Sequence, residues 1–238
     1  MKKAKKIKLY IGLFYTLFVG AFLYYLFSKF SLQEITSYDF IKNNRDNFFE
    51  LKQSNLFLLA TTFFLFTIVW VLAAGFGSPI AIFGGFIFGK WIGSIIVVVG
   101  LSVGACLLYV FANFFLKELI KEKFLKKYQN LEIKFKKSEF IFLLIYRFIG
   151  GIPFAISNVL PCIFNVKVFN FFWATLLGIL PQIFLICSIG SGLEKIIEKN
   201  LETPKVIDLI VSPDIYLPLI VFVCLILITI FLRKIFYK

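Results

Sequence analysis

An arginine inside an apolar run is the residue best suited to chemistry in this chain. Arg147 is one of three arginines among 26 basic residues, and the residues before it are almost all apolar. Its planar guanidinium suits a phosphate group, and the backbone N–H groups of Gly150 and Gly151 suit the same anion. We therefore interpret Arg147 as a phosphate contact. The alternative is an arginine that snorkels to an interface or binds backbone carbonyls.

Four further residues join this candidate site. Lys90, beside Trp91, is a second phosphate contact or an interfacial anchor. Asn158 and Gln182 hydrogen-bond a bound headgroup or satisfy carbonyls that helix breaks leave free. Pro153 is the helix breaker between them and Arg147. The candidate substrate-binding residues are Arg147, Gly150, Gly151, Pro153, Asn158, Lys90 and Gln182.

The residue types exclude most enzyme chemistry. The chain contains no histidine, which excludes histidine-based triads, the usual metalloprotease ligands and imidazole proton shuttles. Its acidic residues lie in loops or at segment edges, so paired carboxylates at mid-depth are missing. The cysteines lie in apolar stretches without Cys-x-x-Cys spacing, which indicates neither a disulfide framework nor a zinc site. These cysteines are Cys106, Cys162, Cys187 and Cys224. We expect a protein that is not an enzyme and has no metal or cofactor.

The composition indicates that lipid, and not water, surrounds the helices that position these residues. Of 238 residues 60% are hydrophobic and 19% aromatic, and the mean hydropathy is +0.91. A soluble domain of this length has too much surface to hide so many apolar side chains. The formal charge of +13 comes mostly from lysines between apolar runs, which is typical of membrane proteins and not of nucleic-acid binders. We expect contact with anionic lipid headgroups and no nucleic-acid partner.

The apolar runs predict an all-α polytopic membrane protein with about five spanning helices of roughly 20 residues each. The first run follows a lysine cluster but is longer than a signal sequence and has no cleavage site, so we expect an uncleaved span. Residues 28–54 suit an extramembrane connection. The expected spans are residues 9–27, 55–75, 95–116, 168–190 and 215–232.

Two other segments are apolar but contain too many helix breakers to form continuous lipid-facing helices. They are residues 76–94 and 139–166. Glycine and proline destabilise a helix, and irregular backbone at membrane depth is tolerated only inside protein or beside a watery cavity. We therefore expect broken, re-entrant segments. The expected hinge positions, which include two in the following helix 168–190, are Pro79, Gly84, Gly85, Gly89, Gly178 and Pro181.

The two broken segments resemble each other. A shift of about 74 positions aligns Gly77-Ser-Pro79 with Gly151-Ile-Pro153, and Gly104 with Gly178. Such a pseudo-repeat indicates a transporter-like core whose binding site lies where the broken segments meet. Chance similarity between segments rich in Phe, Ile and Gly is the alternative. In the expected span 95–116, Gly100 and Gly104 have the small-xxx-small spacing that allows close helix contact.

The lysines also predict the orientation in the membrane. They place the N-terminus, residues 117–137 and the C-terminus in the cytoplasm. Residues 117–137 carry eight lysines around an apolar face, which suits an interfacial helix on anionic lipid or a charged connector. Five spans and two re-entrant segments, however, put the termini on opposite sides. Either one broken segment crosses fully or one lysine cluster is misleading.

Residues 145–192 resemble the second half of the VTT domain of the DedA superfamily, in its SNARE-associated Golgi protein branch. The similar features are Arg147 ahead of Pro153-Phe154, Asn158 four residues later, Gly178-x-x-Pro181 and Gly190-Ser191. The segment that contains Pro79, Gly84, Gly85, Phe88, Gly89 and Gly93 resembles the first half. The resemblance covers about residues 55–192.

The chain also departs from this family. It has Pro161 and Cys162 where members usually have Gly or Ala, and Glu139 is only at the edge of its broken segment. Members thought to be proton-coupled carry carboxylates embedded in the membrane, and the apolar parts of the two broken segments have none. A proton relay is therefore not carried over.

The resemblance implies movement of lipid between leaflets, as a phospholipid scramblase or a translocase of a phosphorylated lipid carrier, without nucleotide hydrolysis. The alternatives are an ion- or solute-coupled transporter and a non-transporting membrane scaffold. The resemblance also implies a multi-pass protein of the bacterial cytoplasmic membrane, and the sequence leaves a homo-oligomer open. We expect an N-terminal region (1–54), a core (55–192) and a C-terminal region (193–238).

Overall fold

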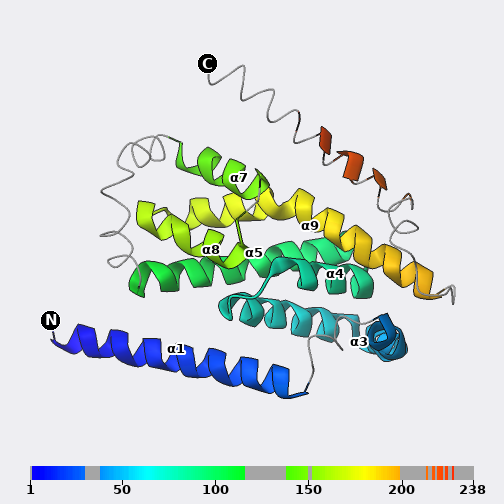
Figure 1. The fold of residues 1–238 in the computed structure, drawn as a ribbon, viewed down its shortest axis with the longest axis horizontal. Helices are drawn as coiled ribbons and strands as arrows, with labels where there is room; N and C mark the ends of the chain where they lie inside the picture. Colours follow the sequence, from blue (N-terminus) through cyan, green and yellow to red (C-terminus); the bar gives the residue numbers. More distant parts are fainter. Residues whose placement is uncertain are drawn as a thin grey trace.

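The computed structural model describes residues 2–29, 38–115, 138–149 and 152–198, and single positions between 213 and 227. The described residues form helices and no strand. The helices are α1 (Lys2–Lys29), α3 (Tyr38–Leu72), α4 (Gly77–Phe88), α5 (Lys90–Phe115), α7 (Glu139–Ile149), α8 (Phe154–Val159), the 3-10 helix η1 (Leu160–Phe164) and α9 (Val168–Glu198). Figure 1 shows α5 in the middle of these helices, with α1 on one side and α7 and α9 on the other.

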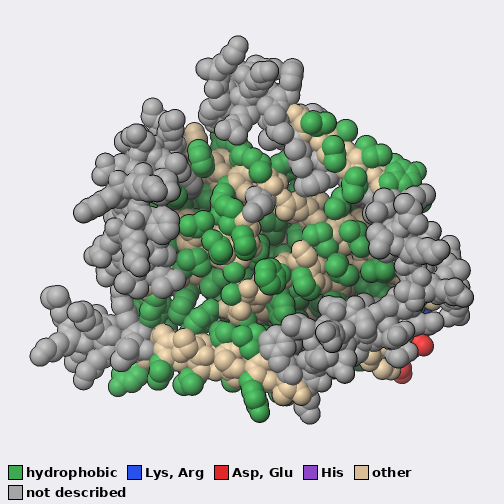
Figure 2. Space-filling view, in the orientation of Figure 1, with side chains coloured by type: hydrophobic (Ala, Val, Ile, Leu, Met, Phe, Trp, Pro, Cys, Tyr) green, Lys and Arg blue, Asp and Glu red, His purple; other side chains and the backbone are tan. Residues whose placement is uncertain are grey.

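Among the described residues, three helices are long and apolar enough to cross a membrane. They are Asn44–Leu72, Lys90–Phe115 and Val168–Lys195. On the face shown in Figure 2 the described surface is mostly hydrophobic, and acidic side chains are visible only at one edge. The expected fold class, an all-α membrane protein, is confirmed.

In the first broken segment α4 runs back along α5, and the hairpin of this unit is α3–α4, joined by the turn at residues 73–76. Gly89 ends α4 with a φ of 79°, a left-handed conformation that favours glycine, and the chain then reverses into α5. Gly84 lies against Val97, where a Cβ would come within 2.5 Å of Val97 Cγ2, and Gly77 faces Leu101. Helices α4 and α5 are therefore antiparallel. Pro79 lies in the first turn of α4, where a proline costs no hydrogen bond.

Helix α3 packs along α5 in the same direction. A Cβ at Gly100 would lie 3.0 Å from Thr67 Cγ2, and one at Gly104 would lie 2.8 Å from Val71 Cβ. The close contact predicted from the spacing of these two glycines is confirmed. Leu72, the last residue of α3, is therefore level with the middle of α5 and not with its end. The helix is kinked at Asn55, and residues 38–54, expected as a connection, form its first half.

The second broken segment is also a hairpin. The Glu139 carboxylate accepts hydrogen bonds from the Lys167 backbone N–H (2.8 Å) and the Asn170 side chain (3.0 Å), which aligns the start of α7 with the start of α9. After α7 the chain turns at Pro153 into α8 and η1, which lead back along it. Asn165, in the left-handed conformation with a φ of 53°, ends η1 before α9 begins.

The two hairpin units have the same plan and opposite directions. In each unit a glycine of the long helix packs on the helix that opens the unit: Gly104 of α5 on α3, and Gly178 of α9 on α7. The ring of Tyr109 lies 4.6 Å from that of Phe171, and the ring of Trp91 lies 4.8 Å from that of Phe184, so α5 and α9 are antiparallel. The predicted pseudo-repeat is thus an inverted repeat.

Helix α1 is antiparallel to α5. The ring of Tyr15 stacks on Phe111 at 4.0 Å, and the Tyr15 hydroxyl donates to the Leu72 carbonyl. Further along α1, Phe22 lies 6.1 Å from Phe66 of α3. The N-terminus of α1 is therefore at the same end of the molecule as the C-terminus of α5.

Some expectations need correction. The interruption expected at Gly178 and Pro181 is wrong, because α9 continues through both residues. Helix α9 also extends beyond the expected span 168–190 to Glu198, so the acidic residue Glu194 lies in a helix and not in a loop. Gly84 and Gly85 lie inside the regular helix α4 at close helix contacts. The hinge role of Gly84 and Gly85 stays a prediction. Residues 117–137 and most of the expected span 215–232 lie outside the described residues.

Candidate functional site

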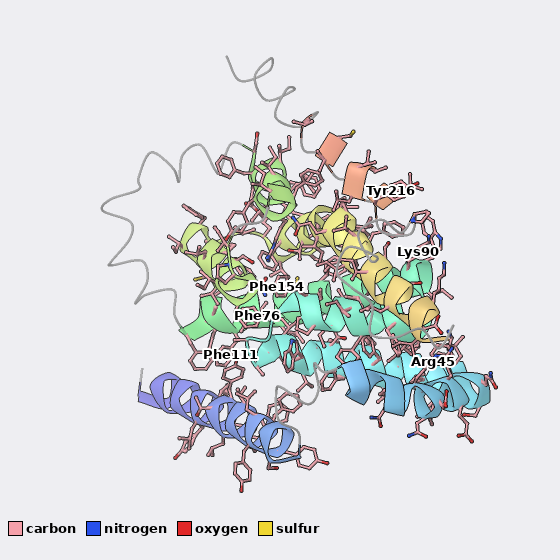
Figure 3. All side chains as sticks on the ribbon, turned by 45° about the vertical axis from the view of Figure 1, so that its right-hand side comes forward. Arg45, Phe76, Lys90, Phe111, Phe154 and Tyr216 are labelled. Carbon is pink, nitrogen blue, oxygen red and sulfur yellow. The ribbon has the colours of Figure 1, made fainter. Side chains whose placement is uncertain are left out.

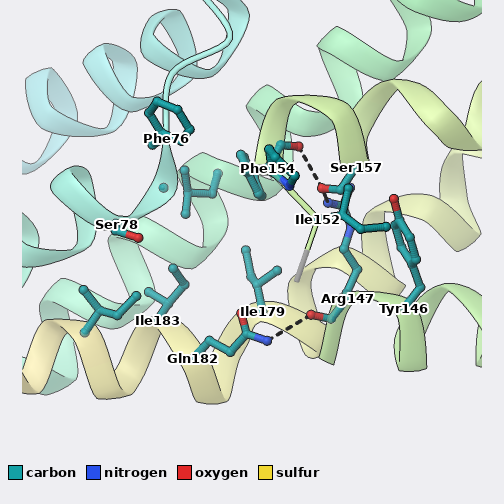
Figure 4. Close-up of a pocket in the computed structure, with 14 residues that line it drawn as sticks. Phe76, Ser78, Tyr146, Arg147, Ile152, Phe154, Ser157, Ile179, Gln182 and Ile183 are labelled. Carbon is teal, nitrogen blue, oxygen red and sulfur yellow. Dashed lines mark hydrogen bonds between the residues drawn. The ribbon is translucent and has the colours of Figure 1, made fainter. Parts of the chain in front are cut away.

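A cavity of about 270 Å³ lies where the turns of the two hairpins meet (Figure 4). The α3–α4 turn and the α7–α8 turn face each other across it, and α5 and α9 supply its walls. This is where the pseudo-repeat places a binding site. The lining residues are Phe76, Gly77, Ser78, Leu101, Tyr146, Arg147, Ile152, Pro153, Phe154, Ser157, Ile179, Gln182, Ile183 and Ile186.

Arg147 is the charged residue of this lining, and it is almost fully buried, with 4% of its surface exposed. Each guanidinium nitrogen donates a hydrogen bond: Nε to Thr175 Oγ1 (3.1 Å), one terminal nitrogen to Ser157 Oγ (2.5 Å) and the other to Asn158 Oδ1 (2.6 Å). The three acceptors come from α8 and α9. The guanidinium therefore has a defined position between these helices.

Helix α7 brings Arg147 to this place because its buried face is turned towards α9. Leu143 and Arg147, four residues apart, are the buried residues of α7. At the crossing, a Cβ on Gly178 would lie 2.5 Å from Arg147 Cβ and 3.1 Å from the Leu144 carbonyl oxygen. Only a glycine at position 178 lets the two helices approach so closely.

The charge of Arg147 has no acidic partner in the described structure. Its three hydrogen-bond acceptors are neutral, and the cavity lining contains no Asp or Glu. Ion pairs join Arg45 to Asp46 and to Glu194, and neither pair involves Arg147. The guanidinium carbon lies 5.0 Å from the ring centroid of Phe171 and 5.5 Å from that of Phe154, contacts that offset only part of the cost of burial. An anion in the cavity would supply the missing charge.

Several donors remain available for such an anion. A guanidinium has five N–H groups, and the three hydrogen bonds leave one on each terminal nitrogen. The hydroxyl of Tyr146, which lines the cavity, is buried and has no hydrogen-bond partner. The Nδ2 of Asn158 is also buried without a partner, beside Arg147 but outside the lining. Buried polar atoms without a partner are uncommon and indicate a ligand or water.

Gln182 shows one of the two roles considered for it. Its Nε2 donates to the carbonyls of Phe148 (2.6 Å) and Arg147 (3.2 Å) at the end of α7 (Figure 4). These carbonyls have no partner in the next helical turn, because the chain turns away after α7. Gln182 therefore satisfies the helix break, and it lines the cavity as well.

The structure brings together some of the candidate residues and separates others. Arg147, Pro153 and Gln182 line the cavity, and Asn158, fully buried, holds Arg147. Lys90 is not part of the lining. Figure 3 shows it with Arg45 towards one end of the helices, whereas Phe76 and Phe154 lie together near the middle. Gly150 and Gly151 lie outside the described residues.

Sequence reasoning missed the residues that hold or accompany Arg147. Ser157 lies next to Asn158 in the short helix α8, and Tyr146 directly precedes Arg147. Thr175 is a polar residue in the long apolar run of α9, which is the one signal that could have pointed to it. Among the described residues, no group of three His, Cys, Asp or Glu side chains could hold a metal ion.

Fold and site together define a class of protein: an α-helical membrane protein with two inverted hairpins around a buried arginine. Residues 75–192 match the VTT domain family, and this range contains the cavity-lining residues of both turns. The chain belongs to this family, which confirms the resemblance to the DedA superfamily.

Two relatives illustrate the family. The chain is 26% identical over 136 residues to a protein of Caenorhabditis elegans called transmembrane protein 41 homolog, and this covers 54% of the chain and 55% of that protein. It is 30% identical over 116 residues to the uncharacterized protein YqeD of Bacillus subtilis (strain 168), covering 48% and 55%. The match thus spans about half the length of these relatives. No solved structure matches the chain significantly.

Proposed function

We propose that this protein moves lipid between the two leaflets of the membrane, as a phospholipid scramblase or a translocase of a phosphorylated lipid carrier. One observation carries the proposal: Arg147 is buried beside a cavity between two inverted hairpins and has only neutral partners. A lipid phosphate would pair with the free N–H groups of the guanidinium, whose fork suits phosphate oxygens.

The position of the cavity suits a molecule with a polar head and apolar tails. Leu101, which lines the cavity, is near the middle of α5. Phe76 and Ile152, one on each hairpin turn, are 64% and 40% exposed at the mouth. The headgroup would lie against Arg147 and the polar side chains of the lining, while the tails leave between Phe76 and Ile152 and stay in lipid.

The inverted repeat supports movement in both directions. Because the two hairpins have opposite orientations, each leaflet would meet an equivalent half of the structure. No covalent step, nucleotide hydrolysis or proton relay is part of this mechanism, so the protein would act as a passive transporter and not as an enzyme. The lysine-rich sequence and the Bacillus relative support a place in a bacterial cytoplasmic membrane.

The proposal can be tested in liposomes that contain a fluorescent phospholipid. Dithionite bleaches the outer leaflet, and the protein should make the inner pool accessible as well. The Arg147→Ala variant should bleach like empty vesicles, while Lys167→Ala, at an exposed lysine just before α9, should behave like the wild type. If wild type and Arg147→Ala both match empty vesicles, the proposal is wrong.

Substrate-dependent currents or pH changes would favour a coupled solute transporter instead. Tolerance of Arg147→Ala together with sensitivity to loss of surface lysines would favour a scaffold.

A further inference from the structure

We infer that the cavity selects lipids whose headgroup carries a net negative charge over zwitterionic lipids, and that these lipids reach it sideways from the bilayer. This inference rests on the proposed function. It names the class of substrate that the charges and the mouth of the cavity favour.

The first argument is the charge balance of the cavity. Of the 14 lining residues Arg147 is the one with a charge, and the other polar side chains are the hydroxyls of Ser78, Tyr146 and Ser157 and the amide of Gln182. A phosphate that enters this space finds a cation and unpaired donors. A bound anion also neutralises a guanidinium that is otherwise buried without a counter-charge.

A zwitterionic headgroup meets a different situation. Its ammonium group enters with the phosphate, and the lining has no carboxylate to receive it. Two positive charges would then share a small, poorly solvated space, where their repulsion is stronger than in water. A headgroup with phosphate as its sole charge avoids this repulsion.

The second argument is the mouth of the cavity. Phe76 and Ile152 flank it, and the nearby Ile149 and Ile156 are exposed apolar residues as well. The described residues on these turns carry no exposed charge that would attract a dissolved ion. A phosphate attached to acyl chains can enter between apolar side chains at this depth, whereas free phosphate would have to cross hydrocarbon to reach the same place.

The test compares two lipids with identical tails. Vesicles of phosphatidylcholine receive traces of phosphatidylglycerol or of phosphatidylcholine, each labelled on an acyl chain, so that the headgroups stay native. We expect the wild-type protein to make inner-leaflet phosphatidylglycerol accessible to dithionite about tenfold faster than phosphatidylcholine. Release of inorganic phosphate trapped in the same vesicles should not exceed that from empty vesicles.

Two variants test whether the charge causes the preference. Arg147→Gln keeps a hydrogen-bonding side chain without the charge, so the two lipids should move at equal rates, both well below the wild-type rate for phosphatidylglycerol. Ser78→Asp adds a carboxylate at the mouth, in the first turn of α4 where an acidic residue suits the helix end, and should shift the preference towards phosphatidylcholine. Lys167→Gln removes an exposed positive charge just before α9 and should keep the wild-type preference.

The outcomes separate the inference from the proposed function. Equal, protein-dependent rates for both lipids would overturn the charge preference and leave lipid movement intact. Movement of neither lipid would overturn the proposed function itself. Protein-dependent release of trapped phosphate would overturn access from the bilayer.

Discussion

Gly178 of α9 lies directly against Arg147 of α7, so closely that a Cβ at position 178 would come within 2.5 Å of Arg147 Cβ. The residue aligned with Gly178 in the first unit, Gly104, packs in the same way on Val71 of α3. The contact therefore sets both the distance between α7 and α9 and the position of Arg147. It predicts that stability and function are coupled at this glycine.

Gly178→Ala should push α7 away from α9 and displace Arg147. Because the added methyl meets both a side chain and the Leu144 carbonyl, we expect a loss of about 1–3 kcal/mol in the free energy of unfolding, together with loss of lipid movement. Thermal unfolding in detergent and the dithionite assay measure the two effects. Gly20→Ala is the matched control, because no atom lies within 4 Å of a Cβ there. Equal behaviour of the two variants would contradict the role of this contact.

Gly85→Ala should be more damaging than Gly100→Ala. A Cβ at Gly85 would lie 2.0 Å from the backbone carbonyl oxygen of Cys187, so α4 and α9 would have to separate. At Gly100 the nearest atoms are the Cγ2 and Cβ of Thr67, at 3.0 and 3.2 Å, so the overlap is much smaller than at Gly85. We expect a loss of ~3 kcal/mol or more for the first variant and clearly less for the second. Size-exclusion chromatography and thermal unfolding of the purified variants check the order, and a reversed order would refute it.

Arg147→Lys should keep the charge and lose most of the function. A lysine ammonium is a single point charge, and it cannot donate to Thr175, Ser157 and Asn158 in the geometry of the guanidinium fork. We expect lipid movement to fall about tenfold, with some preference for anionic lipid retained. The dithionite assay with the two labelled lipids measures both quantities. A variant as active as the wild type would show that the charge alone is sufficient.

The packing also predicts the topology. Helices α1 and α9 are both antiparallel to α5, whereas α3–α4 and α7–α8 turn back beside the middle of α5. If these two hairpins are re-entrant, the crossing helices are α1, α5, α9 and the expected last span. This even number of crossings places both termini and residues 117–137 on one side, as the lysines predict. In this topology α3 does not cross, although its segment Asn44–Leu72 is long and apolar enough to do so, and the conflict found in the sequence disappears.

Cysteine labelling on intact cells checks this topology. In a cysteine-free background, a membrane-impermeant maleimide should label Glu50→Cys and Glu202→Cys and should not label Lys3→Cys, Lys126→Cys or Lys238→Cys. Labelling of all five after permeabilisation is the control. If Lys3→Cys and Lys238→Cys differ in accessibility, an odd number of segments crosses the membrane.

Composition and local pattern were sufficient for part of the fold and of the site. Apolar runs, lysine positions and helix breakers predicted a helical membrane protein with two broken segments, because each depends on residues close together in the sequence. Arg147 was identified for the same reason, since a charge in an apolar run is a local feature. The break at Gly89 was predicted correctly, whereas the one at Gly178 and Pro181 was not, because tertiary packing holds α9 together there.

The sequence by itself thus determined the solvent, the helices and the one charge at the centre of the site. Only the tertiary structure decided which residues surround that charge, since Thr175 and Ser157 reach Arg147 from separate helices and no local pattern encodes their contact. It also decided that the two units are inverted, and that Lys90 is not part of the cavity lining. The physical reason is that contacts between distant residues depend on how closely helices can approach, and glycines such as Gly85 and Gly178 set that distance.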